Sequence, residues 1–155
     1  FNIIGPGLPD HYFAAALAKR LLQQKADLDS GRTTDRTFEV HNPQATRDFI
    51  DVRDVASAVS FLLTEHPPVA GEASVFNIAT GVETTILEVA RYLGELAGDL
   101  TPEPAGQASS RSGITRSAGA ADRITGCGWQ PVVSWQTSIS DLFDQKRPGH
   151  RSIES

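Results

Sequence analysis

The chain has 155 residues, of which 39% are apolar, and its formal net charge is −5 at neutral pH. The length fits one domain or part of a larger one, and the apolar fraction is sufficient to build a core. The acidic balance disfavours nucleic acid as a partner, because a phosphate backbone requires clustered Lys and Arg. No apolar run approaches the roughly 18 residues of a membrane-spanning helix, so we expect no membrane association.

Two features of the sequence bear on the cellular compartment and on whether the chain is part of a longer one. Its only cysteine, Cys127, cannot form an internal disulfide, which fits a cytoplasmic protein. The glycines on either side and the absence of an activating neighbour favour a buried structural thiol. The chain contains no Met and opens on an apolar stretch that begins with Phe1. We therefore expect a truncated or processed chain whose domain begins upstream.

The first 40 residues read as strand, helix and strand. Phe13, Leu17 and Leu21 recur at a spacing of four, which predicts an amphipathic helix with Asp10 as its N-cap. A polar stretch breaks this period, and alternation then resumes around Phe38. The predicted elements are a strand over 1–4, a turn over 5–7, a helix over 11–24, a loop over 26–36 and a short strand over 38–40.

The middle of the chain carries two capped helices. Residues 47–51 are predicted to be extended, with Asp51 capping a helix that prolines end after His66. Residues 75–79 form an apolar run that predicts a buried strand. Thr85 and Glu88 have the spacing of a capping box, which starts the next helix with an apolar stripe from residue 86 to 96.

The last third is less regular. Residues 98–121 are rich in Gly, Pro, Ser and Ala and are predicted to be a loop, followed by a helical turn at 122–125. Ser134 caps a final helix, and the tail over 148–155 is predicted to be disordered. The alternation of strands and helices indicates an α/β fold. Only the 75–79 run looks fully buried, so the remaining strands of its sheet must come from upstream sequence or another chain.

The sequence contains no recognisable catalytic constellation. It has no glycine-rich dinucleotide turn of the Rossmann kind, no P-loop, no nucleophile elbow and no cluster with zinc spacing. The four histidines are scattered. We therefore predict no catalytic residue and no metal ligand, and local patterns alone single out neither Arg47 nor Arg111.

The order of motifs resembles the C-terminal half of the extended short-chain dehydrogenase/reductases, the nucleoside-diphosphate-sugar epimerases and dehydratases. The resemblance covers the chain from its first residue to about residue 147, as one C-terminal nucleotide-sugar-binding portion over 1–147. Within this family the chain is most similar to GDP-mannose 4,6-dehydratases and GDP-4-keto-6-deoxy-mannose reductases. The matching segments are residues 1–7, 47–55, 75–81, 85–90 and 123–131.

The resemblance implies a Rossmann-like fold of which this chain holds the substrate-binding part plus the last strand and helices. It implies NAD or NADP as the cofactor of the complete enzyme, with Asn2 and Pro6 beside the nicotinamide end. Arg47 and Arg111 match arginines that hold the nucleotide diphosphate. Residues from Phe38 to Asn42 match the edge that frames the base.

Other properties of the family are absent or altered. The glycine-rich turn and the Tyr-x-x-x-Lys pair are missing, so this chain alone is expected to be inactive. Acids that the family often carries are replaced near Arg111 and by Ala120, which puts the ribose contact and the anchoring of this loop in doubt. The leading interpretation is the substrate-binding half of an NAD(P)-dependent nucleotide-sugar epimerase, dehydratase or reductase. The alternative is a non-catalytic relic that acts as a binding or interaction module. Either should self-associate or pair with an N-terminal half.

Overall fold

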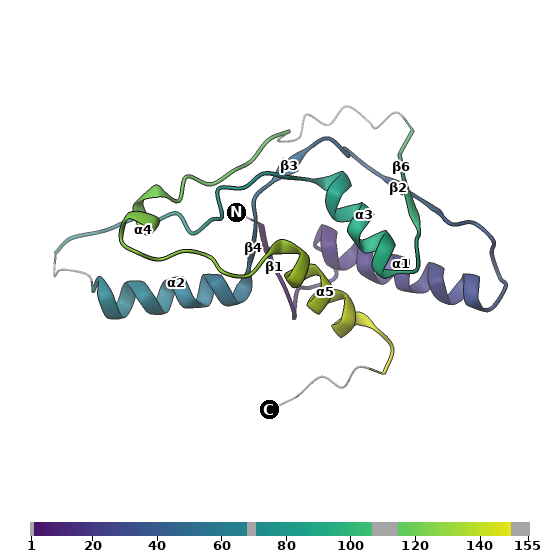
Figure 1. The fold of residues 1–155 in the computed structure, drawn as a ribbon, viewed down its shortest axis with the longest axis horizontal. Helices are drawn as coiled ribbons and strands as arrows, with labels where there is room; N and C mark the ends of the chain where they lie inside the picture. The colour runs from purple at the N-terminus through teal and green to yellow at the C-terminus, as the bar shows by residue number, and fades with distance from the viewer. Residues whose placement is uncertain (1, 68–70, 107–114, 150–155) are drawn as a thin grey trace.

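The structure is a computed structural model, and it describes residues 2–67, 71–106 and 115–149 (Figure 1). Helices and short strands alternate along the chain, as the sequence predicts for an α/β fold. The helices are α1 (Phe13–Asp29), α2 (Val52–Glu65), α3 (Ile86–Leu96), α4 (Asp122–Gly126) and α5 (Trp135–Lys146). The strands are β1 (Asn2–Ile4), β2 (Thr37–Val40), β3 (Thr46–Arg47), β4 (Phe49–Asp51), β5 (Thr84–Thr85) and β6 (Thr101–Pro104).

Within the described residues the strands form three two-stranded sheets. β1 and β4 are parallel, with Ile3 opposite Ile50. β2 and β6 are also parallel, and β3 pairs with β5 in the antiparallel sense. The two strands of each pair are distant in sequence. The pairing of β1 with β4 thus brings the N-terminal strand beside residues 49–51.

The β1–β4 pair separates two apolar cores. Phe49 belongs to the larger core, which α1, α3 and α5 enclose together with β2. Its neighbour Ile50 belongs to the smaller core, which also contains Ala58, Ile124 and Trp129. Successive side chains of a strand point to opposite sides, so β4 serves both cores. Figure 1 shows the consequence: α2 extends away from β4 on the side opposite to α1.

The first helix differs from its prediction at both ends. It begins at Phe13 after Tyr12 and continues to Asp29, through part of the segment predicted as a loop. Asp10 is not its N-cap. The Asp10 carboxylate instead forms salt bridges with Lys19 and with Lys146 of α5, and these two lysines lower the pKa of Asp10 to about 2. Asp10 therefore connects the start of α1 to the end of α5.

The three other predicted caps are confirmed. Asp51 accepts a hydrogen bond from the Arg53 N–H at the start of α2. Thr85 and Glu88 form the reciprocal capping box of α3. Ser134 accepts from the Thr137 N–H at the start of α5. Each cap satisfies a backbone donor that has no partner within its helix.

The predicted strand over 75–79 is wrong. The structure assigns no strand to these residues, and Val75 is 76% exposed whereas Ala79 is fully buried. The segment is held by side chains instead: Arg123 donates to the Val75 carbonyl, and Asn77 donates to that of Ala120. An apolar run forms a strand only where a neighbouring strand completes the hydrogen-bond ladder, and none of the described residues does so.

The segment over 98–121, predicted to be a loop, contains the strand β6. Cys127, predicted to be buried, is half-buried. The helical turn at 122–125 is confirmed as α4. Of the predicted disordered tail, Pro148 and Gly149 form an exposed turn after α5, and 150–155 lie outside the described residues. No helix within the described ranges has the length and apolarity needed to cross a membrane.

Candidate functional site

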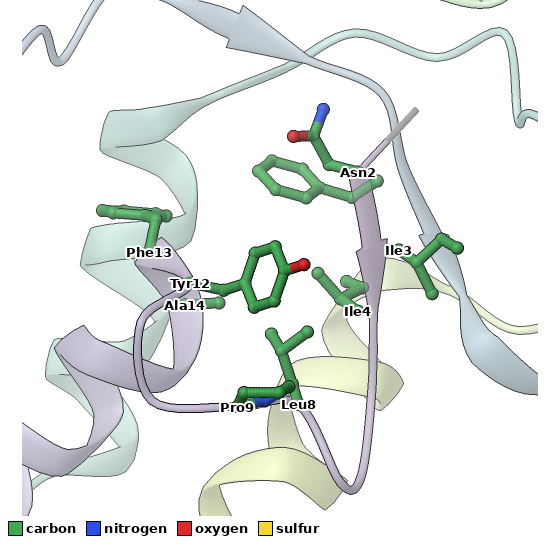
Figure 2. Close-up of a pocket in the computed structure, with 9 residues that line it drawn as sticks. Asn2, Ile3, Ile4, Leu8, Pro9, Tyr12, Phe13 and Ala14 are labelled. Carbon is green, nitrogen blue, oxygen red and sulfur yellow. The ribbon is translucent and has the colours of Figure 1, made fainter.

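A hollow of about 350 Å³ lies where β1 leads into α1. Its walls are largely apolar, and the Asn2 side chain supplies an amide at one end (Figure 2). The Tyr12 ring lies between the strand and the helix, with Leu8 and Pro9 beneath it in this view. The remaining lining residues are Ile3, Ile4, Phe13, Ala14 and Phe49. An apolar cavity with few polar groups is typical of a small-molecule site.

A second hollow, of about 210 Å³, adjoins the first along α1. It lies between the first turns of α1 and the end of β2, and its polar rim consists of Arg20, Glu39 and His41. Phe13 lines both hollows and is 37% exposed. We call these two neighbouring hollows together the α1 groove, which runs from Asn2 past Phe13 to His41.

Arg47 lies next to the Asn2 end of this groove. The backbone N–H of Asn2 donates to the Asp48 carbonyl, and Asn2 is the register partner of Phe49. Arg47 directly precedes Asp48, so its backbone lies close to the Asn2 end of β1. The Arg47 guanidinium donates to its neighbour's carbonyl at Thr46, and no salt bridge among the described residues includes Arg47.

Three carboxylates surround Arg47 in sequence, but all are buried and bonded elsewhere. Asp48 accepts from Thr80, Gly81 and Gly119. Asp51 accepts from Arg53 and from Ser138 of α5. Asp54 accepts from the backbone N–H groups of Val132 and Val133. Each is at most 1% exposed, so these acids join distant segments rather than face a ligand.

The pKa of the Asp51 carboxyl is lowered. Burial alone would raise this pKa, but the hydrogen bonds from Arg53 and Ser138, together with the Arg53 charge, outweigh it. The Asp51 carboxylate is thus held in its charged form between α2 and α5. Arg53 also forms a salt bridge with Asp141 of α5, which strengthens the same junction.

The segment that follows the Gly- and Ser-rich stretch is firmly anchored. Thr46 donates its backbone N–H to the Thr115 carbonyl, and its hydroxyl donates to Glu83. Glu83 also accepts from Arg116. The hydrogen bonds from Thr46 and Arg116 hold the pKa of Glu83 below its ordinary value. The sequence lacks the acids that usually anchor this loop. Residues 115–119 are nevertheless anchored, through bonds at Thr115, Arg116 and Gly119.

The structure brings some predicted site residues together and separates others. Asn2 lines the α1 groove and Arg47 lies beside it, but Pro6 lies in the exposed turn after β1 and does not line the groove. Phe38 is 6% exposed with its ring in the larger core. Asn42 is exposed, with a φ of 50° in the turn after β2. Arg111 lies outside the described residues.

Sequence reasoning missed Tyr12 and Phe13 as groove residues. The spacing of Phe13 with Leu17 and Leu21 predicts a core position, and the structure leaves its ring partly exposed. Tyr12 is 51% exposed and its ring lies 4.2 Å from that of His11. The signal that could have revealed them is the run of three aromatic residues, His11 to Phe13, that begins four positions after the Gly-Pro-Gly turn.

Comparison with known proteins identifies the family. The model of the NAD-dependent epimerase/dehydratase family matches residues 1–79, half of the chain. The chain belongs to this epimerase/dehydratase family. Membership confirms the Rossmann-like extended short-chain dehydrogenase/reductase fold, since solved members superpose on nearly all of the chain.

Two curated members of the epimerase/dehydratase family are 32% identical to the chain. One is the GDP-6-deoxy-D-mannose reductase of Pseudomonas aeruginosa, matched over 92% of this chain and 45% of the relative. The other is the dTDP-L-rhamnose 4-epimerase of Burkholderia thailandensis, matched over 91% and 36%. The chain thus spans less than half the length of these relatives.

Solved structures of epimerase/dehydratase members give the same picture. The structure of RMD from Pseudomonas aeruginosa with NADPH has a TM-score of 0.74 and 29% identity, and covers 94% of this chain and 46% of its own. The UDP-glucose 4-epimerase of Thermus thermophilus with NAD has a TM-score of 0.70 at 24% identity, over 96% and 45%. Related members are therefore NAD(P)-dependent. No group of three metal-binding side chains occurs in the described ranges.

Proposed function

We propose that this chain is the substrate-binding part of an NAD(P)-dependent enzyme that acts on a nucleoside-diphosphate sugar. The observation that carries the proposal is the α1 groove, with Asn2 at one end and aromatic side chains along it. The backbone of Asn2 is bonded to that of Asp48, the residue after Arg47. A nucleotide sugar combines a planar base, two phosphates and a hexose. An apolar groove next to an arginine suits this combination, because guanidinium groups form paired hydrogen bonds with phosphate oxygens.

The surroundings of Arg47 support a role in phosphate binding. The acids nearest in sequence, Asp48 and Asp51, are occupied by other donors. Neither of them neutralises Arg47, so its charge is available to an anionic ligand. In this proposal Arg47 holds the diphosphate, and Val40 and His41 at the end of β2 lie where the base would be framed.

The Asn2 end of the groove fits one face of a nicotinamide cofactor. A nicotinamide ring is flat, and Ile4 and Leu8 offer it an apolar wall while Asn2 offers an amide for a polar contact. Such a cofactor would supply hydride transfer to or from the sugar. The residues of this chain would only bind and orient, because the sequence lacks the family's glycine-rich turn and Tyr-x-x-x-Lys.

Calorimetric titration with GDP-, UDP- and dTDP-hexoses tests this proposal, with turnover measured in parallel in the presence of NAD(P). We expect saturable binding of at least one nucleotide sugar, with no turnover by this chain alone, because it lacks an agent for general acid–base chemistry. The free hexose serves as the control and should not bind. Absence of binding across the panel, or turnover above background, would contradict the proposal.

A specific observation also supports an interaction role. α2 exposes an apolar stripe, which we define as Val52, Ala56, Val59 and Leu63, spaced along one helical face. Val52 is 40%, Val59 46% and Leu63 63% exposed. The chain spans less than half of its relatives, so we propose that the cofactor-binding half of this fold covers the stripe. In its absence the stripe should drive self-association.

The expected result is an assembly larger than a monomer in sedimentation velocity, together with fluorescence of a dye that binds apolar surface. Replacing Val59 and Leu63 with Ser should shift the chain toward monomer and reduce dye binding several-fold. Glu65→Gln, at the end of the same helix, is the matched control and should change neither. A wild-type chain that is monomeric and binds no dye would overturn the interaction role.

A further inference from the structure

Asp48 stands apart from the other buried acids because it draws together three separate segments around the proposed phosphate-binding arginine. Its Oδ1 accepts from the Thr80 N–H at 3.0 Å and the Thr80 hydroxyl at 2.7 Å. Its Oδ2 accepts from Gly81 at 2.9 Å and from Gly119 at 3.0 Å. Asp48 itself is completely buried. Two oxygens with four well-placed donors form a fully satisfied buried carboxylate.

None of these four donors carries a charge. Three are backbone N–H groups and one is a hydroxyl, so dipoles rather than a cation stabilise the Asp48 carboxylate. A carboxylate can accept from all four donors at once. The isosteric amide cannot, because its NH₂ group is itself a donor and would face backbone N–H groups.

The residues on either side of Arg47 are fixed to the same two segments. Thr46 bonds to the Thr115 carbonyl and to Glu83, which also holds Arg116. Arg47 itself pairs with Thr84 in the β3–β5 ladder. The backbone of residues 46–48 is therefore held between residues 80–84 and 115–119, with the Asp48 carboxylate as the buried centre of the junction.

We propose that Asp48 is a positioning residue, which fixes the backbone that carries Arg47 and thereby aims the guanidinium at the diphosphate of the ligand. This inference rests on the proposed function of Arg47. Asp48 touches no ligand. It acts through the geometry of Arg47, in the way that supporting hydrogen bonds hold a binding group within a fraction of an ångström of its productive position.

The test compares Asp48→Asn with Asp54→Asn in the full 155-residue chain. Asp54 is a matched control because it too is buried, at 1% exposed, and accepts two backbone N–H groups, from Val132 and Val133 at 3.1 and 3.0 Å. Calorimetry with GDP, UDP and dTDP measures diphosphate binding. The ¹⁵N signal of the Arg47 Nε–H, assigned through Arg47→Lys, reports the guanidinium without any ligand.

We expect Asp48→Asn to weaken nucleoside-diphosphate binding about tenfold and to shift or broaden the Arg47 Nε signal, whereas Asp54→Asn changes affinity less than about twofold. Equal affinity losses in the two variants, or an unchanged Arg47 signal in Asp48→Asn, would overturn the proposal. If the wild-type chain binds no diphosphate while the Arg47 signal still responds to Asp48→Asn alone, the proposed function is wrong and the positioning role stands.

Asp48→Asn could also prevent folding, and Thr80→Val keeps the inference testable in that case. This variant removes the hydroxyl donor at 2.7 Å but keeps the shape of the side chain and the Thr80 backbone N–H. We expect a smaller loss of affinity in the same direction, about threefold, with a shift of the Arg47 signal. An unchanged signal and affinity in Thr80→Val would contradict the role assigned to Asp48.

Discussion

Gly94→Ala should destabilise the chain by about 3 kcal/mol, which corresponds to a fall of roughly 10 °C in Tm. A Cβ atom at residue 94 would lie 2.1 Å from the Leu100 carbonyl oxygen and 3.3 Å from the Phe38 ring. The first of these neighbours is backbone and cannot rotate away. The contact also carries a hydrogen bond from the Leu100 N–H to the Gly94 carbonyl, so displacing α3 would disturb the start of β6.

Gly126→Ala is the matched control, because Gly126 also lies in a helix and a Cβ there meets no atom within 4 Å. Alanine is favoured over glycine in helices by up to about 1 kcal/mol, so this variant should be neutral or slightly stabilised. Thermal unfolding followed by circular dichroism measures both variants. Similar Tm values for the two would show that α3 does not approach the Leu100 backbone as closely as described.

Arg47→Ala should weaken binding of a nucleotide sugar by roughly tenfold to a hundredfold, because each charge-assisted hydrogen bond contributes about 1.5–3 kcal/mol. Binding of the corresponding nucleoside, which has no phosphate, should barely change. The salt dependence of binding should also decrease, since a screened ionic contact is lost. Calorimetry at two salt concentrations gives both quantities.

Two further variants separate charge from geometry at this position. Arg47→Lys keeps the charge but loses the paired donors, so its affinity should fall between those of wild type and Arg47→Ala. Arg91→Ala removes an exposed arginine of α3. No residue of α3 lines either hollow of the α1 groove, so this variant should bind like wild type. Equal affinities for the nucleotide sugar in all four proteins would mean that the diphosphate is held elsewhere.

Local signals in the sequence were reliable where the interaction is itself local. The caps at Asp51, Thr85 and Ser134 each involve residues within three positions, and the structure contains all three. Asp10 has the same apparent signal before α1. Its carboxylate is taken instead by Lys19 and Lys146, and the second of these is 136 residues away. A competing long-range charge is invisible to a local pattern.

The strands show the same limit. Pro102 and Pro104 argue against a strand at β6, yet the neighbouring Thr101 and Ala105 donate their N–H groups to Arg36 and Val40. The prolines occupy the alternate positions, whose backbone nitrogens need not pair with β2. Strand formation thus depends on how the segment is aligned with its partner strand, and the sequence of one segment alone does not show that alignment.

The resemblance predicts some residues of the candidate site, but it does not predict the hydrogen bonds of Asp48 that hold the backbone around Arg47. The resemblance indicates Asn2, which lines the α1 groove, and Arg47, whose neighbour Asp48 accepts a hydrogen bond from the Asn2 N–H. The role of Asp48 was not foreseen, because its donors Thr80 and Gly119 are 32 and 71 positions away. An aspartate between an arginine and an apolar residue looks like any surface acid in sequence, and only the fold reveals that it is buried.

The most direct test of the account is a map of amide chemical shifts in the ¹⁵N-labelled chain during titration with the tightest-binding nucleotide sugar. We expect the largest changes along the α1 groove, at Asn2, Ile4, Tyr12, Phe13 and His41, and at Arg47. Residues of α4 should not respond, because they lie across β4 in the smaller core. Saturable changes confined to residues 131–135, which line a separate hollow, or no changes at all, would contradict it.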